Sequence, residues 1–177
     1  MILGAVLAGG RSSRFGSDKA AARWNGRALI EHAAALIGQQ VDAVVIVGGP
    51  RGDVADLPRP GLGPLGGIAG ALGHAAAHGF ASVLTIACDT VRVPGDLLPA
   101  LLRRAPSFCE DAPVLGHWPA ELRERLLAWI EGEDRSVRGW AREVGALPIA
   151  ASGPIANVNT PADLDALARD GEDVLAL

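Results

Sequence analysis

Residues 2–20 read ILGAVLAGGRSSRFGSDKA, an apolar run from Ile2 to Leu7 followed at once by a loop rich in glycine and cations. The run is too short for a stable isolated helix, and its composition is typical of a strand buried in a parallel sheet. Two further runs of this kind span Ala43 to Val47 and Ser82 to Ala87. The sequence therefore predicts three buried parallel strands.

Helical periodicity separates and follows these strands. Apolar residues recur at three- and four-residue spacing in Leu29-Ala33-Leu36-Ile37 and in Leu122-Leu126-Leu127-Ile130. Proline or an N-cap residue predicts further helix starts near Pro94, Pro119 and Thr160. This alternation predicts a three-layer α/β/α, Rossmann-like fold with a mostly parallel central sheet, whose ligands bind beyond the carboxyl ends of the strands.

Composition restricts the class of protein. A chain of 177 residues with 49% hydrophobic and 20% charged residues is expected to form one globular domain over residues 1–177. The net charge of -4 argues against a general nucleic-acid partner, because such binding needs clustered cations. Cys88 and Cys109 form neither a disulfide framework nor a zinc motif, and no apolar run is long enough to span a membrane. A cytoplasmic location is the simplest expectation.

The loop after the first strand has the composition of an anion-binding site. Gly9 and Gly10 allow backbone N–H groups to approach an anion closely, and Arg14 and Lys19 can neutralise a triphosphate. The loop lacks the Gly-Lys-Ser/Thr ending of a P-loop and the GxGxxG spacing of a dinucleotide site. A tight connection after the strand is the alternative explanation of the glycines.

The whole loop, LAGGRSSRFGSDKA, resembles the first loop of the MobA-like nucleotidyltransferases, and the pair Asp18-Lys19 strengthens the resemblance. The resemblance implies the nucleotidyltransferase version of the Rossmann-like fold. It also implies nucleotide contacts at Leu7, Ala8, Gly9, Gly10 and Lys19.

A single carboxylate follows the third predicted strand, in Ala87-Cys88-Asp89-Thr90. One Asp is enough for a metal–nucleotide complex, because Mg²⁺ completes its coordination with waters and substrate phosphates. Asp89 could instead serve only as a helix cap or turn residue. The residues resemble the family's Cys-Asp-Thr motif, which implies that Asp89 binds Mg²⁺ and the nucleotide, whereas Cys88 is expected to be a packed thiol.

Two more segments resemble active-site loops of the family. Asn157 and Asn159 alternate along a predicted extended segment, so that both side chains are expected on one face, although they could merely satisfy turn backbone. Gly63, Pro64 and Leu65 precede a predicted helix whose N-terminus would favour phosphates, although a flexible connection is equally compatible with these residues.

The resemblance implies magnesium-dependent transfer of GMP from GTP to the phosphate of molybdenum-bound molybdopterin, the molybdenum cofactor, with release of pyrophosphate. Arg14, Lys19 and Asp89 are the implied catalytic residues. No general base is needed, because a phosphate nucleophile is already anionic, and the four histidines are expected to be packing or surface residues. GTP, the molybdopterin cofactor and, transiently, cofactor-insertion proteins are the implied partners.

Two segments depart from the family pattern. Residues 48–60 are short and rich in Gly and Pro, so base-selecting residues cannot be assigned there. Residues 103–119 are also short, and Ala112-Pro113 replaces the usual His-Pro before Gly116-His117-Trp118-Pro119. Transfer of CMP or another nucleotide to molybdopterin or another small phosphorylated acceptor therefore stays open, as does a non-catalytic nucleotide-binding module.

Overall fold

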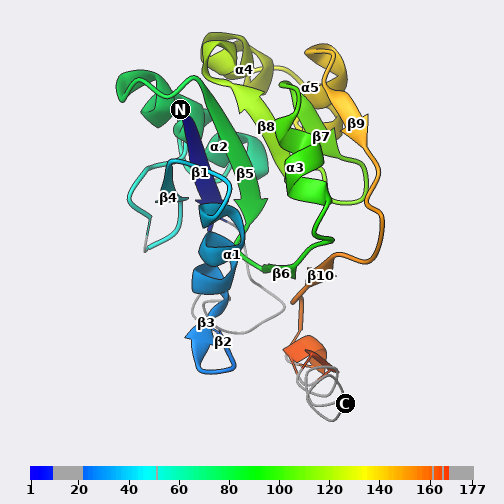
Figure 1. Cartoon of the computed structure of the whole chain (residues 1–177). Helices are drawn as coiled ribbons and strands as arrows, with labels where there is room; N and C mark the ends of the chain where they lie inside the picture. Colours follow the sequence, from blue (N-terminus) through cyan, green and yellow to red (C-terminus); the bar gives the residue numbers. More distant parts are fainter. Residues whose placement is uncertain (10–21, 51, 161, 165, 168–177) are drawn as a thin grey trace.

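A six-stranded sheet forms the centre of the computed structural model, which describes residues 1–9, 22–50, 52–160, 162–164 and 166–167 (Figure 1). The strands, in spatial order, are β4 (Ala43–Val47), β1 (Ile2–Leu7), β5 (Ser82–Ala87), β8 (Gly116–Pro119), β7 (Ser107–Cys109) and β9 (Leu147–Ile149). The bounds of β1, β4 and β5 confirm the three strands predicted from their apolar runs.

The sheet is mostly parallel. β1 pairs in parallel with both β4 and β5, and β7 pairs in parallel with β9. β8 is antiparallel to its neighbours β5 and β7. The prediction of a mostly parallel sheet is confirmed, and the antiparallel strand β8, which was not predicted, joins its two parallel parts.

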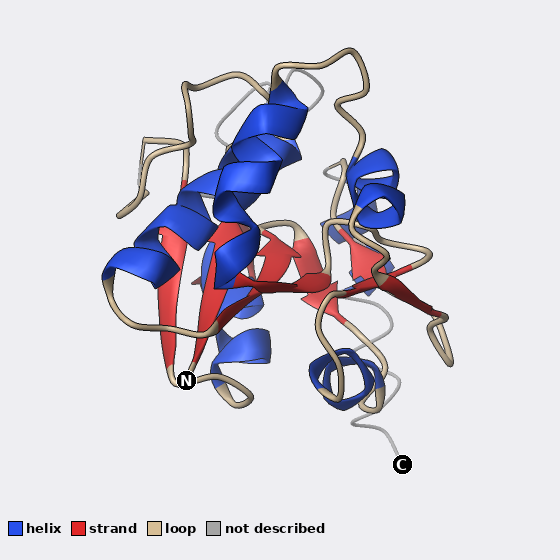
Figure 2. Ribbon diagram, turned by 90° about the horizontal axis from the view of Figure 1, so that it is seen from above, coloured by secondary structure: helices blue, strands red, loops and turns tan. Residues whose placement is uncertain are grey.

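Helices cover both faces of the sheet (Figure 2). They are α1 (Leu29–Gly38), α2 (Pro64–Ala77), α3 (Leu97–Leu102), α4 (Arg123–Ile130) and α5 (Val137–Glu143). α2, α4 and α5 pack in one core cluster with Leu3, Ala5 and Leu7 of β1, whereas α1 and α3 pack in a second cluster with Val6. Side chains alternate along a strand, so one short apolar run supplies both cores. The predicted three-layer arrangement is confirmed.

The predicted helix starts were close to the observed ones. A 3₁₀ turn, Ala120–Leu122, follows Pro119 before α4, and α3 starts three residues after Pro94. At Thr160 the hydroxyl accepts the N–H of Asp163 at 3.3 Å, and the Asp163 carboxylate accepts the N–H of Thr160 at 2.8 Å. This reciprocal capping confirms a helix start at Thr160.

Two small ribbons lie at the lower end of the sheet in Figure 1. β2 (Arg23–Trp24) and β3 (Arg27–Ala28) form a hairpin whose turn residues, Asn25 and Gly26, both have positive φ. β6 (Thr90–Arg92) follows β5 in the chain and pairs in antiparallel fashion with β10 (Ala156–Asn157).

Within the described ranges, every helix is too short or too polar to cross a membrane.

His117 of β8 is a packing residue, as expected for the histidines. It is buried, with Nε2 2.8 Å from Ser82 Oγ and Nδ1 3.3 Å from the Leu101 carbonyl oxygen. Burial lowers the pKa of His117, and the hydrogen bond to Leu101 opposes that effect only in part. The neutral imidazole is therefore the form that the fold favours.

Stability should consequently fall as the pH drops below about 6.5, because the unfolded chain binds a proton that folded His117 does not bind until lower pH. Replacement of His117 by Gln keeps a polar side chain but removes this titration. We expect the urea midpoint to fall less between pH 7.5 and pH 5.5 in His117→Gln than in the wild type. An equal fall in both proteins would contradict this role of His117.

Candidate active site

The carboxyl ends of three adjacent strands meet at one edge of the sheet. Leu7, the last residue of β1, is in register with Val47 of β4 and Ala87 of β5. The Ala8 N–H donates to the Val47 carbonyl at 2.8 Å, and the Cys88 N–H donates to the Leu7 carbonyl at 3.1 Å. The first loop and the segment containing Asp89 therefore leave the sheet side by side.

The predicted nucleotide contacts divide into described and undescribed residues. Leu7 is buried with its side chain toward α2, so only its backbone could face a ligand, while Ala8 and Gly9 follow at the sheet edge. Gly10, Arg14 and Lys19 lie outside the described residues. The described part of the loop thus brings backbone groups to this edge, and the role of the cations stays a prediction.

The segment after β4 brings a carboxylate to the same edge. Val54 pairs in parallel with Val47, and its carbonyl accepts the Gly48 N–H at 2.8 Å. The Leu57 N–H donates to the Gly66 carbonyl of α2 at 3.0 Å. These contacts hold Asp56 between the end of β4 and the beginning of α2.

Asp56 is surrounded by glycines. A Cβ built on Gly48 would lie 2.6 Å from Asp56 Oδ1, one on Gly9 would lie 3.1 Å from Oδ2, and one on Gly67 would lie 3.7 Å from Oδ1. Oδ1 is buried and has no hydrogen-bond partner among the described residues, and burial raises the pKa of Asp56. An unpaired buried carboxylate oxygen is costly, so this atom is suited to accept a hydrogen bond from a ligand.

Sequence reasoning did not single out Asp56. Its only signal was an acidic residue between the apolar residues Ala55 and Leu57, within a segment otherwise rich in glycine and proline. Asp56 becomes recognisable as a site residue only in the folded chain, where its segment lies beside β4 and its Oδ1 is buried.

The predicted loop before α2 lies next to Asp56. Gly63 has a φ of 67°, a conformation that favours glycine, and Pro64 begins the helix. Leu65 is fully buried, so its side chain belongs to the core and only its backbone could contact a ligand. The N-terminus of this 14-residue helix adds positive potential at the site.

Asp89 lies beside the predicted active-site segment that contains Asn157 and Asn159. The Asp89 carbonyl accepts the Val158 N–H at 2.9 Å, and the Thr90 hydroxyl donates to Asn157 Oδ1 at 2.8 Å. Asn159 lies beyond β10, exposed, and its N–H donates to Asp163 Oδ2 at 2.7 Å. The structure therefore brings Asp89 and Asn157 together, 68 residues apart in the chain.

The donor set at Asp89 is compatible with Mg²⁺ bound mainly through its substrate. No group of three or more His, Cys, Asp or Glu side chains in the described ranges could hold a metal ion. Asp89 is half-buried at the end of β5, and Mg²⁺ often uses one or two protein carboxylates together with waters and phosphates. A metal at this edge would thus need the nucleotide to complete its coordination.

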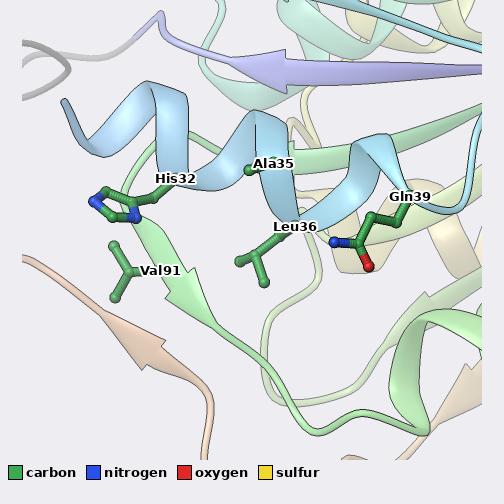
Figure 3. A pocket seen from close by; sticks show the side chains of 5 residues that line it. All are labelled: His32, Ala35, Leu36, Gln39 and Val91. Atoms are coloured by element: carbon green, nitrogen blue, oxygen red, sulfur yellow. The ribbon is translucent and has the colours of Figure 1, made fainter. Parts of the chain in front are cut away.

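A separate open pocket of about 220 Å³ lies beside α1, where Val91 of β6 faces the helix (Figure 3). Its lining residues are His32, Ala35, Leu36, Gln39 and Val91. None of them is a carboxylate or a strong cation, and none belongs to the predicted site. Nucleotide chemistry is therefore better sought at the edge that holds Gly9, Asp56 and Asp89.

Residues 4–147 match the sequence profile of the MobA-like NTP transferase domain. The chain belongs to this family. It is 35% identical to the molybdenum cofactor guanylyltransferase of Cereibacter sphaeroides, over 92% of this chain and 93% of that protein. The enzyme of the same name from Rhizobium leguminosarum bv. trifolii is 37% identical, over 92% of this chain and 90% of that protein.

Solved structures of other nucleotidyltransferases share the fold. The molybdopterin-guanine dinucleotide biosynthesis protein A of Archaeoglobus fulgidus superposes with a TM-score of 0.75 at 21% identity, covering 98% of this chain and 100% of that one. A nucleotidyl transferase from Methanothermobacter thermautotroptrophicus gives a TM-score of 0.70 at 21% identity, with 96% and 97% covered. The MobA-like resemblance and the expected fold are therefore confirmed.

A methyl group at Gly48 should close the site. Gly48→Ala places a Cβ against Asp56 and, at a φ of 72°, should also lose about 1–2 kcal/mol of stability. Gly145→Ala is a matched control, because Gly145 has a φ of 66° and nothing within 4 Å of a built Cβ. We expect both variants to lose stability through the positive φ, Gly48→Ala the more because its Cβ also meets Asp56 and the Gly9 backbone, but only Gly48→Ala to lose about tenfold or more in nucleoside triphosphate affinity by calorimetry. Equal affinities in the two variants would separate Gly48 from the nucleotide site.

Proposed function

We propose that this protein transfers GMP from GTP to the phosphate of molybdenum-bound molybdopterin, giving the guanine dinucleotide cofactor and pyrophosphate. The relatives that are 35% and 37% identical over most of the chain are named molybdenum cofactor guanylyltransferases. Membership of the MobA-like NTP transferase family supports the reaction type.

The observation on which the proposal chiefly rests is the convergence of Gly9, Asp56 and Asp89 at one edge of the sheet. Backbone N–H groups after β1 are suited to phosphates, and the carboxylate of Asp89 is suited to a divalent cation held by those phosphates. Asp56 Oδ1 can accept a hydrogen bond and has no donor among the described residues. An ionised phosphate has no donor to offer, whereas the base and ribose of a nucleoside carry N–H and O–H groups. The edge thus offers a complementary group to each part of a nucleotide.

Asp56 is best suited to the guanine base. Two adjacent donors, N1–H and the N2 amino group, lie on the Watson–Crick edge of guanine, and a carboxylate can accept both. Cytosine offers only its amino group on that edge. This complementarity favours GTP over CTP. Asp56 is therefore the base-selecting residue that we propose within residues 48–60, where the sequence alone allowed no assignment.

The proposed reaction forms a bond between an oxygen of the acceptor phosphate and the α-phosphorus of GTP. The bond from that phosphorus to the oxygen bridging to the β-phosphate breaks, and pyrophosphate leaves. Because the attacking phosphate is already an anion, the chain's residues chiefly orient the reactants and offset the developing negative charge. Gly9 positions the phosphates, and Arg14 and Lys19 offset charge, in the roles that the family resemblance implies.

Asp89 would hold Mg²⁺ against the triphosphate. The ion, when bound, would neutralise charge on the phosphates and on the leaving pyrophosphate. Gly63 and Pro64 lie at the beginning of α2, and Asn157 pairs with Thr90, the residue after Asp89. Asn157 and Asn159 are proposed to face the acceptor.

The activity is tested by pyrophosphate release from GTP with molybdenum-bound molybdopterin and Mg²⁺, compared with CTP, ATP and UTP. Lys19→Ala should lower turnover by roughly 10²- to 10³-fold, because a transition-state charge partner is lost. Asp89→Ala should abolish the Mg²⁺-dependent part of GTP binding in calorimetry.

Arg135→Ala, at an exposed position between α4 and α5, is the control and should keep turnover within about twofold. GTP binding without release of pyrophosphate on any acceptor would instead support a nucleotide-binding module. Turnover with CTP in place of GTP would support cytidylyl transfer.

Asp56→Asn tests base selection separately. Loss of a charge-assisted acceptor should weaken GTP binding by about tenfold and leave CTP binding nearly unchanged. Because folding disfavours the ionised form of Asp56, the ligand-free variant should also have a slightly higher urea midpoint at pH 7.5. An equal loss of GTP and CTP affinity would assign Asp56 to the ribose or to the architecture of the loop.

A further inference from the structure

We propose that Thr90 is a positioning residue, which orients the side-chain amide of Asn157 so that its NH₂ group donates to the phosphate of the acceptor. The inference rests on the proposed function, because it assigns a task to a hydrogen bond beside the proposed magnesium carboxylate. Thr90 is the new residue, since Asn157 was already predicted from the sequence.

The hydrogen bond joins two segments that are distant in the chain. Thr90 is 4% exposed, and its hydroxyl donates to Asn157 Oδ1 at 2.8 Å. Thr90 and Asn157 are also backbone partners in the β6–β10 ribbon, and the neighbouring Val158 N–H donates to the Asp89 carbonyl. The segment that carries the amide is thereby held against the Asp89 backbone.

The direction of the hydrogen bond decides which end of the amide is available. The Thr90 hydroxyl has Asn157 Oδ1 as its acceptor, so a reversed amide would leave a buried O–H without an acceptor. Among the described residues, no group accepts a hydrogen bond from Asn157 Nδ2, so both of its N–H groups are available to a ligand. Two N–H donors suit a phosphate, whereas a carbonyl oxygen in their place would repel one.

The position of the β6–β10 ribbon indicates that Asn157 contacts the phosphate of the acceptor rather than the nucleotide. Gly9, Gly48 and Asp56 lie on the β1 and β4 side of Asp89, whereas β6, which follows β5, and its partner β10 lie on the other side (Figure 1). In-line transfer requires the incoming phosphate and the leaving pyrophosphate to lie on opposite sides of the α-phosphorus. A nucleotide held on the Asp56 side leaves the Asn157 side for the acceptor.

Thr90→Val tests the inference, since it removes the hydroxyl and keeps the branched shape. We expect the KM for molybdenum-bound molybdopterin to rise about fivefold to tenfold, while the Kd for GTP with Mg²⁺ stays close to the wild-type value. Thr90→Ser restores the hydroxyl and should restore the KM for the acceptor. A hydroxyl that only stabilised the fold would not separate the two substrates in this way.

A double-mutant cycle shows whether Thr90 acts through Asn157. Thr90→Val added to Asn157→Ala should change the acceptor KM little further, because the amide to be oriented is already gone. Additive effects, an unchanged acceptor KM in Thr90→Val, or a failed rescue by Ser would each overturn the inference. If the wild type itself neither binds GTP nor transfers GMP, the proposed function fails instead, so the two failures are distinguishable.

Discussion

Parallel pairing of β1 with β4 and with β5 is the constraint on which the site depends. Because Leu7 is in register with Val47 and with Ala87, the three strands end at the same level and the chain leaves them as adjacent loops. Hydrogen bonds from Ala8 and Cys88 extend this alignment by one residue on each side. Residues that are 80 positions apart thereby reach one edge without any long side chain having to span the distance.

The same edge is kept open at some expense of stability. A region selected only for stability would avoid the positive φ at Gly48 and an Asp56 oxygen that has no hydrogen-bond partner among the described residues. Immediately behind them, Leu65 and Ile68 of α2 are fully buried. A well-packed helix thus supports the polar groups at this edge, an arrangement that keeps binding groups oriented before the ligand arrives.

Asp89 separates two halves of the proposed site. The β1 and β4 side offers glycine backbone and a carboxylate acceptor, which suits a nucleotide, while the β6–β10 side offers amide donors, which suit a phosphate. The hydrogen bond from Val158 to the Asp89 carbonyl ties the second half to the end of β5. Substrate discrimination in such a site is proposed to arise from the difference in hydrogen-bonding groups, since the protein as a whole is acidic and does not attract anions by net charge.

The sequence by itself determined the three parallel strands, the two-faced helical cover and the family, because short apolar runs, helical periodicity and contiguous motifs are local properties of the chain. It did not reveal the antiparallel strand β8 or the role of Asp56. A four-residue strand such as β8 depends on its neighbours for pairing, and Asp56 becomes a buried acceptor only after its segment folds back against β4 and α2. The tertiary structure alone decided these features, because burial and the direction of a hydrogen bond, as between Thr90 and Asn157, are set by groups remote in sequence.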